Sequence, residues 1–230
     1  MIKYLKSLAS LLYPELCIAC LKHEPVHDNI LCHICWEDTP WFSDIGDSRY
    51  LLEERFPLIY GENVSFYGLF LYSKSGGVQN ILRQIKYYGK GHLAYKLGQI
   101  LGTKISSDQY DALIPVPLHY KKERRRGYNQ TELIAKGIHE VSKIQIIKTA
   151  LEKKVNTGSQ TQMDRAARHM SVSKSFGIKT PLMQNIARVL LIDDVVTTGA
   201  TLDVCTTLLK KDRDLNLHVD YAFLAMSISS

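Results

Sequence analysis

The chain has 230 residues, of which 45% are hydrophobic, and 29 Lys and Arg against 23 Asp and Glu give it a formal net charge of +6. This length and apolar content suffice for one well-buried domain with a small appendage, and they exclude a disordered chain. The positive charge favours an anionic partner, such as a nucleotide, a polyphosphate, a nucleic acid or a lipid head group, without deciding among them.

The first 16 residues carry apolar side chains at helical spacing, with Lys3 and Lys6 between them. No small-residue cleavage site follows, so we expect a surface helix rather than a signal peptide. No uncharged apolar run approaches the length of about 18 residues that a membrane span needs. The sequence therefore predicts a cytoplasmic protein without a transmembrane segment, in which the five cysteines are reduced.

Two Cys-x-x-Cys pairs stand near the N-terminus, Cys17 with Cys20 and Cys32 with Cys35. This spacing is typical of two knuckles that bind one tetrahedral zinc ion. Four thiolates would close the coordination shell, so such a zinc would be structural and would fold a segment too small to bury a core of its own. A redox pair and an iron–sulfur cluster use the same residue type and stay open as alternatives.

A change of pattern divides the chain into three parts. Residues 1–45 are predicted to form the N-terminal helix and zinc knuckle, residues 46–63 a linker, and residues 64–230 the main domain. In the main domain apolar strand patterns alternate with helical ones, which is typical of an α/β domain with a mainly parallel sheet. Strands are expected over residues 65–72, 111–116, 144–147, 189–192 and 217–223, and helical faces over residues 78–85, 93–101, 133–141 and 202–209.

The most informative segment is the apolar strand at residues 189–192, which runs into Asp193, Asp194 and a hydroxyl-rich glycine loop. At the carboxyl end of a parallel strand, the amides of such a loop and the start of the next helix favour a phosphate. The two carboxylates suit ribose hydroxyls or a divalent cation, although an acidic turn before a threonine helix cap would also contain them. The predicted phosphate loop consists of Val195, Val196, Thr197, Thr198, Gly199, Ala200 and Thr201.

The whole string at residues 189–201, Val-Leu-Leu-Ile-Asp-Asp-Val-Val-Thr-Thr-Gly-Ala-Thr, closely resembles the phosphoribosyl-pyrophosphate signature of type I phosphoribosyltransferases. Further motifs over residues 80–202 are Lys-Tyr-Tyr-Gly at residues 86–89, Pro-Val-Pro at residues 115–117, Arg-Arg-Arg-Gly-Tyr-Asn-Gln at residues 124–130, and Thr157 and Gln160 followed by Arg168. Together these motifs resemble those of the ComF family. The chain departs from the family at Lys153 and Val155, where arginines are common, and at Ser171, where many members have Asn.

The resemblance implies a type I phosphoribosyltransferase-like, Rossmann-like domain that binds phosphoribosyl pyrophosphate, or a related sugar phosphate, with Mg²⁺. Lys86, Gln160 and Arg168 would contact this ligand together with the phosphate loop. The polar segment at residues 156–175, which also contains Arg165, would form a lid that excludes water, or else a plain surface loop.

If the protein catalyses transfer, Asp193 or Asp194 would orient the ribose. Mg²⁺ with Arg124 or Arg126 would neutralise the pyrophosphate as it leaves. An active phosphoribosyltransferase on an unidentified base or amine, and a scaffold regulated by phosphoribosyl pyrophosphate, both remain open, because fold alone does not decide function.

The basic block at residues 121–126, Lys-Lys-Glu-Arg-Arg-Arg, offers arginine forks that suit oxyanions. We expect Lys121, Lys122 and Arg125 on a solvated helix face. The family resemblance also implies handling of single-stranded DNA in bacterial competence, with competence proteins such as a helicase as partners. In that case cations would neutralise phosphates, and tyrosines near the basic blocks would stack on unpaired bases. These tyrosines are Tyr87, Tyr88 and Tyr128.

Overall fold

The structure is a computed structural model of the chain, and it describes residues 16–26, 30–45, 52, 64–73, 76–155, 175–182, 185–212 and 217–227. The predicted N-terminal helix and nearly all of the predicted linker lie outside the described residues. The same holds for Gln160, Arg165 and Arg168 of the predicted lid.

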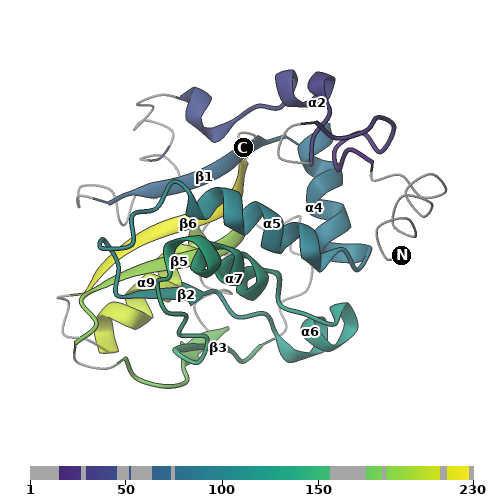
Figure 1. Cartoon of the computed structure of the whole chain (residues 1–230). Coiled ribbons are helices and arrows are strands. Elements are labelled where there is room, and N and C mark those ends of the chain that lie inside the picture. Colours follow the sequence, from purple (N-terminus) through teal and green to yellow (C-terminus); the bar gives the residue numbers. More distant parts are fainter. Residues whose placement is uncertain are drawn as a thin grey trace, which may run out of the picture.

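Four parallel strands form the central sheet in the order β1-β6-β5-β2 (Figure 1). Their bounds are β1 Phe66–Tyr72, β2 Ala112–Pro115, β5 Arg188–Val196 and β6 His218–Ser227. The inner strands β5 and β6 are buried along most of their length, as near-continuous apolar runs are in a parallel sheet with both faces covered. The predicted α/β class with a mainly parallel sheet is confirmed.

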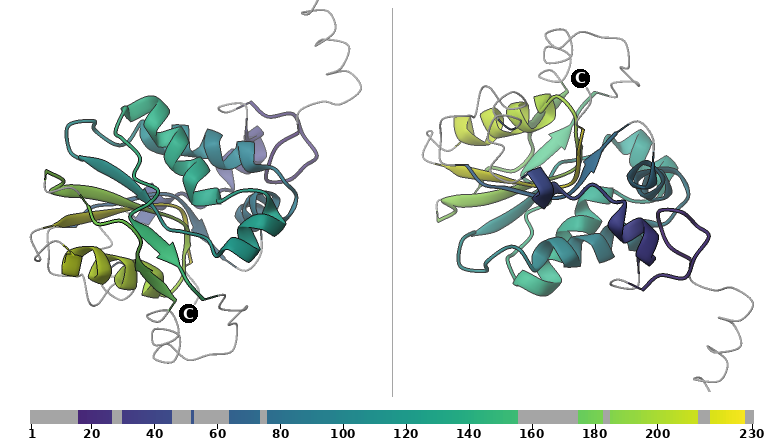
Figure 2. Two further views of the ribbon diagram at one scale, coloured as in Figure 1. Left: turned by 90° about the horizontal axis from the view of Figure 1, so that it is seen from below. Right: turned by 90° about the horizontal axis from the view of Figure 1, so that it is seen from above.

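Helices cover both faces of the sheet (Figure 2). One face carries α4 (Gly77–Tyr87), α5 (Gly91–Gly102) and α7 (Gln130–Ser142), and the other carries α9 (Ala200–Asp212). α5 and α7 cross very closely at Gly98 and Gly137. These glycines permit the close approach, because a Cβ atom on either would collide with the backbone of the facing helix. None of the described helices has the length and apolar composition needed to cross a bilayer.

The segment that carries the four cysteines shares the main core. It contains the short helices α2 (His33–Glu37) and η1 (Phe42–Ile45). Trp41 forms an antiparallel bridge with Phe70 of β1, and its ring centroid lies 4.5 Å from that of Trp36 and 5.4 Å from that of Phe70. Phe42 packs edge-on against Phe223 in the core on the other face of the sheet. The segment thus covers the outer edge of β1, which would otherwise offer unpaired backbone groups.

Several elements differ from the sequence prediction. Residues 144–147 form a single parallel bridge, Ile146 with Leu113, instead of a strand, because they meet only the short edge strand β2. The sequence predicted no strand order, and the last strand in the sequence, β6, lies inside the sheet between β1 and β5. Helix α6 (Tyr120–Arg126) and the antiparallel pair β3 (Leu151–Lys153) and β4 (Phe176–Ile178) have no counterpart in the predicted elements.

Candidate functional site

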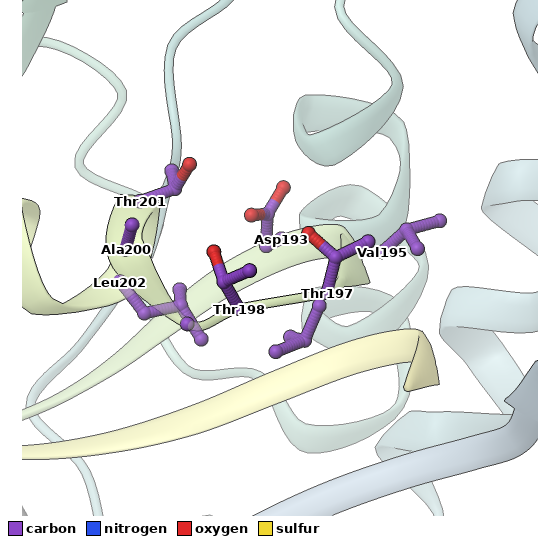
Figure 3. Close-up of a pocket in the computed structure, with 9 residues that line it drawn as sticks. Asp193, Val195, Thr197, Thr198, Ala200, Thr201 and Leu202 are labelled. Carbon is purple, nitrogen blue, oxygen red and sulfur yellow. The ribbon is translucent and has the colours of Figure 1, made fainter. Parts of the chain in front are cut away.

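The carboxyl end of β5 builds a small hollow from a strand, a loop and a helix start. Gly199 has a φ of 75°, a left-handed conformation that favours glycine, and it turns the loop into α9. The hollow has a volume of about 60 Å³ and is lined by Asp193 and residues 195–202, so every residue of the predicted phosphate loop lines it. In Figure 3 the oxygen atoms of Asp193, Thr198 and Thr201 face the same side of the loop.

A larger cleft of about 270 Å³ adjoins this hollow, and both are lined by Asp193, Val195 and Thr201. Its walls come from the end of α4, the loop after β2, α6, the start of α7 and β3. Four cations line it, namely Lys86, Lys122, Arg126 and Lys153, together with the carboxylates of Asp193 and Asp194. The four cations of this cleft can bind anionic oxygens, and its two carboxylates can accept hydrogen bonds from hydroxyls or bind a cation.

Asp194 is buried and held by two partners. Its Oδ2 accepts from Lys86 Nζ at 2.9 Å and from Gln130 Nε2 at 2.8 Å. Arg126 donates through Nη1 to Gln130 Oε1. A buried carboxylate is stable only when it is paired and hydrogen-bonded, so this chain of contacts fixes Asp194 in the free protein.

Asp193 is half-buried, and its Oδ1 accepts from the amide of Asp194 at 2.8 Å. Burial and the adjacent Asp194 carboxylate raise the pKa of Asp193 to about 7, against the opposing effects of the Asp194 amide, Lys86 and Lys153. A cation between the two carboxylates would relieve this repulsion. The carboxylates of Asp193 and Asp194 therefore suit the binding of a divalent metal ion.

The raised pKa of Asp193 makes the stability of the free protein depend on pH. Between its ordinary pKa of 3.8 and about 7 the folded state keeps a proton that the unfolded chain releases. The free energy of unfolding should therefore fall as pH rises through this range, and Asp193→Asn should remove the fall and stabilise the protein at pH 8. Urea unfolding from pH 4 to pH 8 measures this, with Asp108→Asn at an exposed position as the control. An Asp193→Asn profile parallel to the wild-type profile would contradict the assignment.

The Gly-Tyr-Asn-Gln block at residues 127–130 holds the walls of the cleft together. The Asn129 side chain caps α7 by accepting from the amide of Thr131 at 3.2 Å. Asn129 Nδ2 and Thr131 Oγ1 both donate to the carbonyl of Val116, at 3.3 and 2.6 Å. The Tyr128 hydroxyl donates to the carbonyl of Ile85 at 2.5 Å. Tyr128 is thus half-buried and bonded to α4, unlike the exposed Tyr87 and Tyr88.

The cations of α6 differ in whether they line the cleft. Arg126 and Lys122 line the cleft, whereas Arg124 is exposed on the same helix and is not among the lining residues. Lys122 and Arg126 stand one helical turn apart and so share a face. The sequence prediction of a solvated face for Lys122 therefore differs from its place in the structure. Burial, followed by the charges of Lys153 and Arg126, lowers the pKa of Lys122.

Lys153 and Gln130 are site residues that the sequence reasoning did not single out. Lys153 lies on β3 with its ammonium group 4.6 Å from the centre of the Phe176 ring, and it lines the cleft. Gln130 begins α7 and reaches Asp194 from there. The available signals were the family motif that contains Gln130 and the presence of Lys153 where arginines are common in the family.

The four predicted metal ligands come together. The sulfur atoms of Cys17, Cys20, Cys32 and Cys35 all lie within 4.8 Å of one another. Cys20 Sγ and Cys32 Sγ are 3.9 Å apart, and a tetrahedral ion with Zn–S bonds of about 2.3 Å would set its sulfurs about 3.8 Å apart. The donor set and its spacing fit a metal such as zinc, with no coordination position left for a substrate.

No protein-family model matches the chain. It is 31% identical over 102 residues to Competence protein F of Haemophilus influenzae, a match that covers 44% of this chain and 44% of that protein. It is 25% identical over 191 residues to Competence protein ComFC of Bacillus subtilis, covering 82% of this chain and 68% of that protein. It is 24% identical over 139 residues to DNA utilization protein YhgH of Escherichia coli O157:H7, covering 57% of this chain and 60% of that protein.

Two solved structures match 56% of this chain and 25% of their own chains, each with a TM-score of 0.36 and 21% identity. They are the allosteric regulatory enzyme of purine biosynthesis and the glutamine phosphoribosylpyrophosphate amidotransferase of B. subtilis complexed with ADP and GMP. The matches to Competence protein F and YhgH span less than two thirds of those proteins. The chain is thus similar in sequence to competence proteins and DNA utilization proteins, and it combines an α/β fold on a parallel sheet with a strand-to-helix glycine loop and four clustered cysteines.

Proposed function

We propose that the cleft at the end of β5 binds phosphoribosyl pyrophosphate, or a related sugar phosphate, together with Mg²⁺. The observation that carries this proposal is that the small hollow and the larger cleft, which differ in their lining groups, meet at Asp193, Val195 and Thr201. The small one offers loop amides, threonine hydroxyls and the start of α9, which suit one terminal phosphate. The larger one offers two carboxylates beside four cations, which suit a ribose and a pyrophosphate.

Each part of the ligand has its own partners in this proposal. The loop at residues 195–201 holds the 5′-phosphate, and Asp193 and Asp194 accept from the ribose hydroxyls. Lys122, Arg126 and Lys153 face the pyrophosphate. Mg²⁺ supplies positive charge that neutralises the pyrophosphate oxygens and the carboxylate pair.

Two arginines of α6 provide a matched test of this arrangement. Arg126→Met should weaken the affinity for phosphoribosyl pyrophosphate by about 10- to 100-fold, because it removes a charge-assisted hydrogen bond in the cleft. Arg124→Met, at an exposed position of the same helix, should change the affinity less than about twofold, as rim charges do. Isothermal titration calorimetry at constant Mg²⁺ measures both, and equal losses in the two variants would contradict the proposed place of the pyrophosphate.

We also propose that the protein handles single-stranded DNA. Its relatives carry the names competence protein and DNA utilization protein. Tyr87, Tyr88 and Tyr120 are 67%, 70% and 64% exposed. The exposed cations Lys121, Arg124 and Arg125 lie on α6, the helix that begins at Tyr120. Exposed aromatic rings beside cations suit unpaired bases and their phosphates.

Salt dependence tests the DNA proposal. Arg124→Ala with Arg125→Ala should reduce the slope of log affinity against log salt by about 1.4, since each single-strand phosphate contact contributes about 0.7. The exposed pair Lys104→Ala with Lys136→Ala is the control and should leave the slope unchanged. Equal reductions in both variants would show that only the overall positive charge attracts DNA.

The four-cysteine cluster, we further propose, holds a structural zinc ion. All four donors are sulfurs, and the segment that they join contributes Ile18, Ala19, Ile30 and Leu31 to the main core. In this proposal the metal holds that segment folded against β1 and α4.

A further inference from the structure

Helix α4 extends from the four-cysteine segment to the cleft. Asn80 Nδ2 donates to the carbonyl of Ala19 at 3.0 Å, and Gln84 Nε2 donates to the carbonyl of Ile18 at 2.5 Å. Ile18 and Ala19 are the two residues between Cys17 and Cys20. Two side chains of α4 therefore hold the turn that carries two of the metal ligands.

The contact between this turn and α4 is close, and it is buried at Gln84 although Asn80 is exposed. Ile18 is 6% exposed, Ala19 1% and Gln84 4%. A Cβ atom on Gly77, in the first turn of α4, would lie 3.0 Å from Ala19 Cβ. Because a buried amide costs free energy unless it is hydrogen-bonded, Gln84 favours the arrangement in which the cysteine turn is folded.

The other end of α4 reaches the cleft. Lys86, two residues after Gln84, pairs with Asp194 at 2.9 Å. An α-helix rises about 1.5 Å per residue and behaves as a rigid rod over so short a distance. A displacement of Gln84 is therefore passed to Lys86.

We propose that Asn80 and Gln84 are positioning residues that link the four-cysteine segment to the cleft. The folded, metal-loaded segment holds α4 through these two side chains, and α4 holds Lys86 against Asp194. Loss of the metal then weakens ligand binding in the cleft, and ligand binding by reciprocity strengthens metal retention. This inference rests on the proposed binding of a sugar phosphate.

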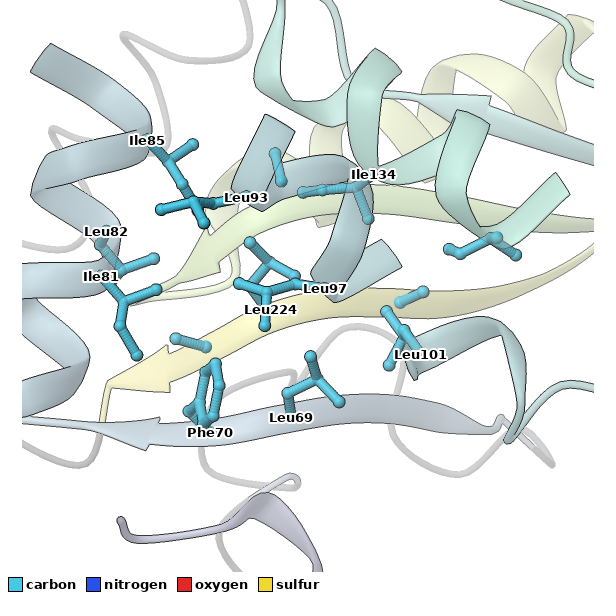
Figure 4. Close-up of a cluster of buried hydrophobic side chains, with 14 of the residues drawn as sticks. Leu69, Phe70, Ile81, Leu82, Ile85, Leu93, Leu97, Leu101, Ile134 and Leu224 are labelled. Carbon is cyan, nitrogen blue, oxygen red and sulfur yellow. The ribbon is translucent and has the colours of Figure 1, made fainter. Parts of the chain in front are cut away.

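A competing explanation gives the two hydrogen bonds no role beyond stability. The apolar side of α4 carries Ile81, Leu82 and Ile85, which pack into the core between α5 and β1 (Figure 4). If this packing alone fixed α4, Lys86 would keep its place without the cysteine segment. An experiment must therefore follow Lys86 itself.

The test uses the full chain, with and without its metal, and compares Asn80→Ala plus Gln84→Met with Leu101→Ala. Leu101 is fully buried in α5, so its truncation lowers stability without touching the cysteine turn. The first readout is the ¹⁵N ammonium signal of Lys86 in the ligand-free protein, assigned by its loss in Lys86→Arg. The second is the affinity for phosphoribosyl pyrophosphate with Mg²⁺.

We expect the double variant to lose the slowly exchanging Lys86 signal and to bind about tenfold more weakly, as a loss of about 1.4 kcal/mol implies. Chelating the metal from the wild type should also remove the Lys86 signal and weaken binding about tenfold. Chelating the metal from the double variant should weaken binding by less than a further factor of about two, because metal loss and the two substitutions break the same link. Leu101→Ala should keep the signal and the affinity.

A double variant that keeps the Lys86 signal would overturn the inference, and so would chelation that weakens binding equally in wild type and double variant. If the double variant does not fold, Gln84→Met alone takes its place with the same expected direction. If the wild type binds no sugar phosphate, the proposed function fails, and the Lys86 signal still decides whether the link exists.

Discussion

Replacing Cys17 and Cys32 by serine is expected to eliminate zinc from the protein and to lower its free energy of unfolding by about 5 kcal/mol or more. Both thiols are buried, at 0% and 4% exposure, and Ile18 and Leu31 beside them belong to the main core. Without the metal this segment would leave β1 and α4 uncovered. Since a domain of this kind has only about 5–15 kcal/mol of stability in total, the variant should lose a large share of it.

Metal analysis and urea unfolding measure this effect. Cys205→Ala is the matched control, because Cys205 is fully buried in α9 but lies outside the cluster. It should lower stability by about 1–2 kcal/mol, as a small core truncation does, and leave one zinc per chain. Zinc content that is the same in the serine variant and the wild type would contradict the proposed metal site.

The sequence predicts those elements whose burial leaves a periodic pattern. The face of α4 at Val78, Ile81 and Ile85 and the run at residues 189–192 are buried as expected, because burial on one helix side or on both sheet faces demands apolar residues at fixed spacing. Helix α6 consists of Tyr-Lys-Lys-Glu-Arg-Arg-Arg and buries none of its residues. It therefore leaves no apolar period from which it could be predicted.

The local parts of the site are predictable, and its long-range contacts are not. The predicted phosphate loop is one continuous segment, and all of its residues line one hollow; that the loop binds a phosphate stays a prediction. Asp194, in contrast, is held by Lys86 and Gln130, which lie far from it in the sequence. Lys122 and Arg126 face the cleft together because they are four residues apart on a helix. This spacing could not be used from the sequence, because α6 was not predicted as a helix.

The carboxylate pair should matter most for the ligand. Asp193→Asn with Asp194→Asn is expected to weaken binding of phosphoribosyl pyrophosphate with Mg²⁺ at least about 100-fold, because it removes both charges that a metal requires and weakens the acceptors for the ribose hydroxyls. Asn has nearly the volume of Asp, so the loop at residues 195–201 should keep its shape. Thermal unfolding of the same samples shows whether the variant is folded.

Isothermal titration calorimetry with phosphoribosyl pyrophosphate and Mg²⁺, on the wild type and this double variant, tests the central claim most directly. The wild type should bind one ligand per chain only when Mg²⁺ is present, and the folded double variant should show no binding. Equal affinity in the two proteins, or a folded wild type that does not bind the ligand, would contradict the assignment of the cleft.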